Sequence, residues 1–124
     1  MKANLVEEKA LDFAIRIVHL REYLTDTKSK DHKLEFVISK QILRSGTSIG
    51  ANISEATAAE SNDDFIHKLA ISQKEAHETR YWLKLLYRTE YINEKMYQSL
   101  LSDCEEIIKL LVKIIKTSKD KSAK

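Results

Sequence analysis

The chain contains no proline and only two glycines in 124 residues, and this scarcity constrains its fold more than any other feature. Proline and glycine are the residues that most often interrupt helices and form turns, so a chain almost without them favours long, unbroken helices. The length suits one domain with a single hydrophobic core. We therefore expect an all-α fold, with a four-helix bundle over residues 1–118 and a short basic tail over residues 119–124.

Apolar residues that recur at spacings of three and four predict two helices in the first half of the chain. Asn4 and Glu7 form a capping-box-like start for the first helix, which is predicted to run to about Leu24. The polar stretch 25–31 is predicted to be a loop, and the second helix is expected to begin near Leu34. Beside its core-facing residues the first helix carries a second apolar row that needs a partner, made of Leu11, Ile15 and Val18.

Capping signals predict two more helices in the second half. The run Ser-Asn-Asp-Asp at 61–64 is typical of a helix start, and Asn93 with Glu94 opens the fourth helix in the same way. Two apolar rows follow in the fourth helix, one with a coiled-coil-like spacing (Leu101, Cys104, Ile108, Leu111, Ile115) and one beside it (Leu100, Ile107, Ile114). Like the second row of the first helix, this second row is expected to need a partner outside the bundle. The lysine-rich sequence from Thr117 predicts a frayed end. Short connections make consecutive helices antiparallel, which favours an up-down-up-down bundle.

The middle of the second helix is unusually rich in small residues. It includes Gly46 and Gly50, each of which costs about 1 kcal/mol relative to alanine inside a helix. Either a close contact with a neighbouring helix or a local kink must compensate for this cost. A buried carboxylate must also be paired, and Arg44 and Arg80 are the candidate partners. We interpret six polar residues as a helix-packing motif: Ser45, Ser48, Asn52, Glu55, Glu75 and Glu78.

The sequence predicts no enzyme, metal centre or cofactor. Four-helix bundles that hold two iron ions use paired Glu-x-x-His motifs, and that pattern is absent here. Asp64 and His67 have the right spacing for one such pair, but a second histidine-bearing pair is missing, so surface or capping roles are expected. Cys104 lies on an apolar stripe, where a thiol is normally inert packing. No small-molecule substrate is evident either.

The expected compartment is the cytoplasm. A single cysteine cannot form an internal disulfide bond, and no charged-then-apolar leader opens the sequence. The longest apolar runs are far shorter than the roughly 20 residues needed to cross a bilayer, so no membrane contact is predicted.

Two groups of basic residues are candidates for nucleic-acid contact. Arg80, Lys84 and Arg88 align along one face of the third helix, and Lys119, Lys121 and Lys124 lie in the tail. The net charge is +2, but the tail holds most of the basic excess, which leaves the folded part near neutral. Stripes of this kind are more often only solvated helix faces. Repeated over several subunits, however, such charges can grip a phosphate backbone.

Two motifs on adjacent helices carry a resemblance to a known family. Residues 44–56 read RSGTSIGANISEA, and Asp64-Phe65 is followed by KEAHETRYWL at residues 74–83. From about Phe13 to Ile115 the chain resembles the bacterial four-helix-bundle proteins known as 23S rRNA intervening-sequence proteins. One departure is Ala56, where such relatives are expected to carry glycine, and this difference bears on how the second helix ends.

The resemblance implies the bundle fold and no established enzymatic activity. Similar bundles include the accessory proteins of diversity-generating retroelements, which form ring-shaped homopentamers and assist a reverse transcriptase by engaging nucleic acid. The resemblance therefore implies a homopentamer and contact with RNA or DNA. We expect a non-enzymatic, oligomeric binding or scaffold protein that contacts structured nucleic acid. The alternative is a protein-binding adaptor with no nucleic-acid role.

Overall fold

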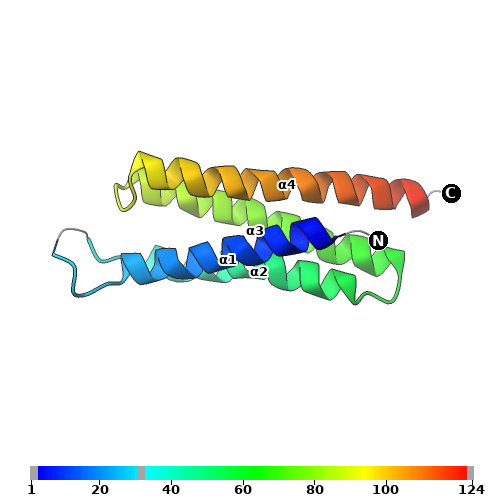
Figure 1. Ribbon diagram of the computed structural model, residues 1–124, viewed down its shortest axis with the longest axis horizontal. Helices are drawn as coiled ribbons and strands as arrows, with labels where there is room; N and C mark the ends of the chain where they lie inside the picture. The colour runs from blue at the N-terminus through cyan, green and yellow to red at the C-terminus, as the bar shows by residue number, and fades with distance from the viewer. Residues whose placement is uncertain (1–2, 31–32, 123–124) are drawn as a thin grey trace.

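The computed structural model describes residues 3–30 and 33–122, which form four long helices side by side (Figure 1). They are α1 (Asn4–Leu24), α2 (Val37–Thr57), α3 (Asn62–Arg88) and α4 (Glu94–Ser122). In each neighbouring pair of helices, the residue numbers of the contacting positions rise along one helix as they fall along the other. Consecutive helices are therefore antiparallel. The expected all-α, up-down-up-down bundle is confirmed.

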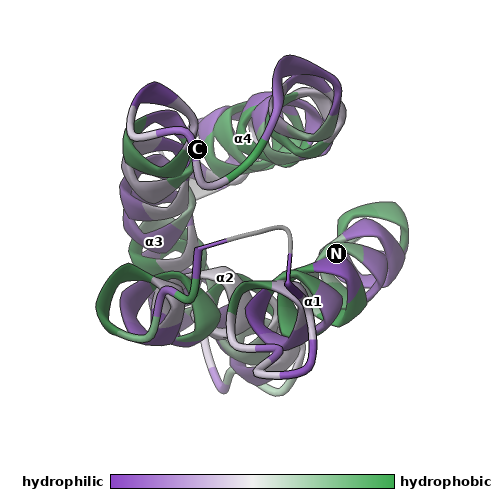
Figure 2. Ribbon diagram, turned by 90° about the vertical axis from the view of Figure 1, so that its left-hand side faces the viewer, coloured by the Kyte–Doolittle hydropathy of each residue, from purple (hydrophilic) through white to green (hydrophobic). Residues whose placement is uncertain are grey.

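Each helix buries one apolar stripe against the others, and Figure 2 shows the four helices end on. In α3 the apolar residues spaced three, four and seven apart are all buried, from Phe65 through Leu69, Ala76 and Leu83 to Leu86. Removing these stripes from water supplies the main stabilising free energy of the fold. The largest fully buried side chains come from all four helices: Phe13, Ile17, Leu24, Ile42, Ile49, Ile53, Phe65, Leu69, Leu83, Leu86, Ile107 and Leu111.

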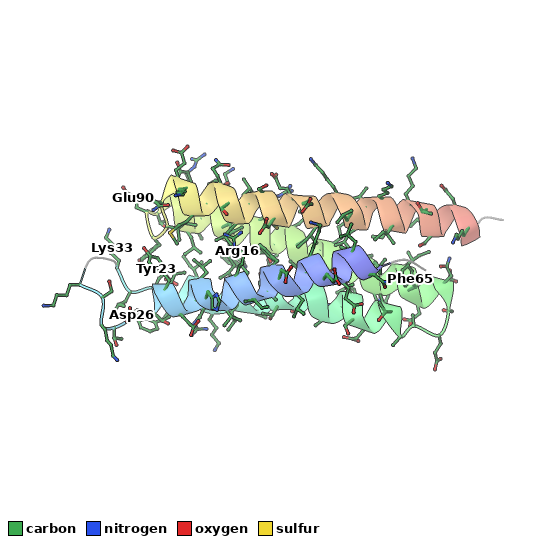
Figure 3. The ribbon with its side chains drawn as sticks, viewed as in Figure 1. Arg16, Tyr23, Asp26, Lys33, Phe65 and Glu90 are labelled. Carbon is green, nitrogen blue, oxygen red and sulfur yellow. The ribbon has the colours of Figure 1, made fainter. Side chains whose placement is uncertain are left out.

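The helix pairs do not pack equally. The α2–α3 contact is the most extensive, whereas α1 and α4 touch least and are visibly more separated in Figure 2. Polar contacts join this looser pair: Arg16 points towards α4 (Figure 3) and its Nη1 lies 2.6 Å from Asp103 Oδ2. Lys9 Nζ lies 2.9 Å from Glu106 Oε1. The bundle is therefore held at this side partly by exposed ion pairs, which contribute less than a packed interface.

Two of the predicted helix starts have the expected caps. Ser61 Oγ accepts a hydrogen bond from the backbone N–H of Asp64 at 3.1 Å, which confirms the start of α3. Asn93 Oδ1 accepts from the backbone N–H of Met96 at 2.8 Å, at the start of α4. In both cases a side-chain oxygen satisfies an N–H group that has no partner inside the helix.

The predicted starts of α1 and α2 need correction. Asn4 is the first residue of α1 rather than its cap, and the cap position is held by Ala3, which is buried in the core and makes no side-chain cap. The chain thus enters α1 through a buried apolar residue and without a side-chain cap. In α2 the helix begins at Val37, and Leu34 lies in the preceding loop. The carboxylate of Glu35 accepts a hydrogen bond from the first turn of α2, which stabilises the later start.

The frayed end predicted from Thr117 is wrong, because α4 remains helical through Ser122. Ser118 is buried, and its carbonyl oxygen accepts a hydrogen bond from Asn62 Nδ2 at 2.9 Å. This contact ties the end of α4 to the start of α3. The basic residues Lys119 and Lys121 therefore belong to an ordered helix.

The second apolar row of α1 and the second apolar row of α4 have different environments. In α1, Leu11, Ile15 and Val18 are 62%, 47% and 42% exposed, so this row lies outside the core as expected. In α4, Leu100 and Ile107 are buried, so the expectation that this row needs a partner outside the bundle is wrong. This second row of α4 lies in the core cluster or packs against it.

The small residues of α2 permit a close approach to α1. A Cβ atom placed on Gly46 would lie 2.9 Å from Cγ1 and 3.0 Å from Cγ2 of Ile17. At Gly50 the nearest atom to such a Cβ would be the Cβ of Ala10, at an ordinary 3.6 Å. Close contact, one of the two explanations considered for these glycines, therefore accounts for Gly46.

We predict opposite effects for alanine at the two glycines. Gly46→Ala should lower the free energy of unfolding by about 1–3 kcal/mol, because the new methyl group overlaps the branched part of Ile17. Gly50→Ala should raise it by up to about 1 kcal/mol through helix propensity. Urea unfolding followed by circular dichroism measures both values. Equal and stabilising effects would show that α1 can move away from Gly46 without cost.

Candidate functional site

A buried polar seam joins α2 and α3. Thr79 Oγ1 donates a hydrogen bond to Ser45 Oγ at 2.9 Å, and both side chains are fully buried. Ser72 Oγ donates to the carbonyl oxygen of Ile49 at 2.8 Å. Thr79 Oγ1 also lies 2.9 Å from the carbonyl oxygen of Glu75 in its own helix. The bond of Ser72 crosses to α2, and a buried hydroxyl that loses its partner is costly, so sliding one helix along the other would be unfavourable. These bonds therefore fix the register of α2 against α3.

An ionic cluster continues this seam towards the surface. Arg44 contacts Glu75 at 3.0 Å and also contacts Glu78, whose Oε2 accepts a hydrogen bond from Trp82 Nε1 at 3.0 Å. The side chains of the two glutamates are only 15% and 33% exposed. Of the two candidate partners for these carboxylates, Arg44 takes the role. One guanidinium can serve both because its N–H groups are spread in a planar fork.

The remaining residues of the packing motif contact their surroundings differently. Ser48 and Asn52 are half-buried and donate to carbonyl oxygens of α2 itself, at 2.6 and 2.8 Å. Glu55 is exposed and pairs with Lys68 Nζ of α3 at 3.1 Å. Within the motif, Ser45, Glu55, Glu75 and Glu78 thus bridge the two helices, whereas Ser48 and Asn52 satisfy backbone groups.

Sequence reasoning did not single out three residues that complete the seam, namely Ser72, Thr79 and Trp82. Ser72 and Thr79 occupy core-facing positions of α3, in the same stripe as Leu69 and Ala76. A hydroxyl side chain on an otherwise apolar stripe was the available signal, because such a group needs a partner on the facing helix.

The basic group on α3 is exposed at only two of its three residues. Lys84 and Arg88 are exposed at the end of α3. Arg80 is half-buried and leans towards α4, with Nη1 3.7 Å from Glu105 Oε2. Its Nη2 also donates to His77 Nδ1 at 2.8 Å. Arg80 is therefore less exposed than Lys84 and Arg88, because α4 supplies a carboxylate beside it.

The second basic group lies at the opposite end of the bundle. Lys119 and Lys121 follow Ser118, which contacts the start of α3, whereas Arg88 is the last residue of that helix (Figure 1). A helix of 27 residues is about 40 Å long at 1.5 Å per residue. One chain thus does not bring the two basic groups together. Lys124 lies outside the described residues.

The described residues offer little for catalysis. Cys104 is fully buried, its Sγ donates to the carbonyl oxygen of Ala76 at 3.3 Å, and burial raises the pKa of the thiol to about 12. Such a thiol is not a nucleophile near neutral pH. In residues 3–30 and 33–122, no three histidine, cysteine or acidic side chains converge in a way that could hold a metal ion. Over the same residues, no helix is long and apolar enough to span a membrane.

The ionic cluster generates a prediction about acid stability. The hydrogen bond from Trp82, followed by the contact with Arg44, holds the pKa of Glu78 below its ordinary value. A carboxylate whose pKa is lower in the folded state stabilises the fold above its unfolded pKa, and this stabilisation is lost as pH falls through the folded pKa. We expect the urea concentration at the midpoint of unfolding to decrease as the pH is lowered from about 5 to about 3. This decrease should be smaller in Glu78→Gln.

Glu55→Gln is the matched control, because Glu55 forms an exposed ion pair with Lys68. It should leave the pH dependence close to that of the wild type. The fluorescence of Trp82, the single tryptophan of the chain, reports unfolding in each variant. Identical pH profiles for the wild type and Glu78→Gln would contradict the assigned role of this carboxylate.

Comparisons with known proteins agree with this architecture. Residues 2–113 match the sequence model of the family described as 23S rRNA-intervening sequence protein. The chain is also similar to the crystal structure of a protein with unknown function from the S23 ribosomal protein family of Bacteroides thetaiotaomicron. The TM-score is 0.87 and the sequence identity 58%, over 94% of this chain and 99% of that one. Neither description names an enzymatic activity, and the search of curated proteins gave no match. The chain belongs to the 23S rRNA-intervening sequence protein family.

Proposed function

We propose that the protein is a non-enzymatic, oligomeric scaffold that contacts nucleic acid. The observation that carries this proposal is the charge at the end of α3, where residues 79–89 contain three cations and no carboxylate. Two of these cations, Lys84 and Arg88, are exposed. Phosphate backbones are bound mainly through such cations, each of which releases counterions from the nucleic acid.

One chain offers few exposed cations, so the proposal includes self-association. The apolar row of α1 leaves three large side chains in contact with solvent, Leu11, Ile15 and Val18. Contiguous apolar patches are uncommon on monomers and mark sites of association. Beside it, a shallow groove of about 270 Å³ runs between α1 and α2 and is lined partly by small residues such as Ala14, Gly50 and Ala51. Small residues allow a helix of a second copy to approach closely.

The proposed assembly is a closed homopentamer. Closed rotational symmetry satisfies every copy of an interface and avoids open-ended filaments. The number five comes from the resemblance to ring-shaped bundle proteins. A ring repeats the α3 cations in every subunit, and affinity then rises through effective concentration without any new type of contact. Lys119 and Lys121, at the other end of each subunit, are a secondary contact in this proposal.

The alternative function is a protein-binding adaptor with no nucleic-acid role. The apolar row of α1 favours this alternative equally well, because another protein could cover the same side chains. The two functions differ in their response to salt. Binding through phosphates weakens steeply as salt is added, whereas an apolar interface depends on salt only weakly.

We predict that α1 mediates self-association. Light scattering should give a particle of about five times the chain mass of 14.3 kDa for the wild type. Ile15→Glu should shift it towards the monomer, because a charge in an apolar interface is desolvated without a partner. Val112→Glu is the matched control, since Val112 is similarly exposed but lies on α4. A wild-type monomer at micromolar concentration would contradict the assembly.

We predict that the α3 cations dominate nucleic-acid binding. The double variant Lys84→Gln with Arg88→Gln should weaken binding to a ribosomal RNA fragment and lower the slope of log affinity against log salt by about 2. The pair Lys119→Gln with Lys121→Gln removes the same charge at the other end and should have the smaller effect. Fluorescence anisotropy over a salt series measures both. No wild-type binding to RNA or duplex DNA at low salt would favour the adaptor function.

A further inference from the structure

An exposed row runs along the side of α3 that faces away from both α2 and α4. Its members recur at spacings of three and four, so they share one face of the helix. All seven are exposed and none is acidic: His67, Ala70, Lys74, His77, Tyr81, Lys84 and Arg88. We call this set the outer row of α3.

Three carboxylates that flank the middle of the outer row have cation partners outside the row. On the side of α2, Arg44 contacts both Glu75 and Glu78. On the side of α4, Glu105 faces Arg80. These pairings reduce the negative potential beside the row, so the charges of Lys74, Lys84 and Arg88 remain available to an anionic partner.

Tyr81 lies in the middle of the outer row and is 59% exposed. Its ring meets the ring of Trp82 edge to face, with centroids 5.1 Å apart and planes at 68°. Trp82 is itself held by the hydrogen bond from its Nε1 to Glu78. The tyrosine ring is therefore backed by an anchored aromatic neighbour while much of its surface remains in contact with solvent. This is the arrangement of a platform on which a planar group can stack.

The charges of the row flank this platform on both sides. Lys74 lies seven residues before Tyr81 and Arg88 seven residues after it, so the cations span about 21 Å along the helix. In a duplex the base faces are stacked inside and do not offer themselves to an aromatic side chain. Unpaired nucleotides present both a free base face and a phosphate backbone, which is the combination that this row matches.

We infer that the outer row of α3 binds a single-stranded segment of nucleic acid, with Tyr81 stacking on an unpaired base and Lys74, Lys84 and Arg88 contacting the phosphates beside it. This inference rests on the proposed nucleic-acid contact and specifies its partner. The row selects unpaired nucleotides over duplex, and it selects them through base stacking rather than through base-specific hydrogen bonds.

The test compares binding of the full chain to 20-nucleotide single strands, oligo(U) RNA and oligo(dT), with binding to a duplex of the same length at low salt. The wild type should bind both single strands at least about tenfold more tightly than the duplex. Tyr81→Ala should weaken single-strand binding by roughly 5- to 100-fold, the range of one stacked base. Tyr81→Phe keeps the ring and should retain most of the affinity. Duplex binding should change little in either variant.

Tyr23→Ala is the matched control, because it removes another exposed tyrosine from a different helix, α1. Circular dichroism and light scattering establish that each variant keeps its helices and its assembly. Equal wild-type binding to single strands and duplex, with no effect of Tyr81→Ala, would overturn this inference and leave the proposed function standing. No wild-type binding to any nucleic acid would overturn both. Dissociation of the oligomer in Tyr81→Ala would identify the row as a subunit contact and also overturn the inference.

Discussion

The register between α2 and α3 is the constraint on which the surface of this bundle depends. Thr79 and Ser45 bond to each other inside the core, and Arg44 joins Glu78 at the edge of the same seam. A helix rotated or shifted by one residue would lose these contacts, and the buried hydroxyl of Ser72 would lose its bond to the carbonyl oxygen of Ile49 on α2. Because residue 79 is held inward, residues 77, 81, 84 and 88 of α3 are exposed. The buried polar contacts and the apolar stripe of α3 together decide which side chains the helix offers to a partner.

The fold was largely predictable because most of its determinants are local. Apolar spacing located all four helices, and the side-chain caps Ser61 and Asn93 marked two of their starts. The errors occurred where distant parts of the chain decide a local feature. Asn4 has the composition of a cap, but the cap position is held by Ala3, which is buried in the core. The end of α4 stays helical with a contact to Asn62, a residue more than fifty positions earlier.

The candidate site was predictable only where one helix suffices to define it. Lys84 and Arg88 follow from helical spacing alone. The contact of Arg80 with Glu105 depends on how α3 and α4 are aligned, which the sequence pattern does not specify. Thr79 shows the same difficulty, since a hydroxyl on an apolar stripe identifies its partner only when the facing helix is known. Individual faces were therefore foreseeable, whereas among the contacts between faces only the pairing of Arg44 with the glutamates of α3 was one of the predicted alternatives.

The arrangement of the helices also separates the two surfaces that the proposals use. Among the described residues α1 packs against α2 and α4, and α3 packs against the same two helices, so α1 and α3 lie diagonally across the bundle (Figure 2). Within one subunit, the cations of α3 therefore lie on the far side of the bundle from a contact made by its apolar α1 row. This separation matters energetically, because lysines and arginines buried between identical subunits would repel one another and lose hydration. Diagonal placement thus keeps the apolar surface and the charged surface of one subunit apart, so that burying the first does not require burying the second.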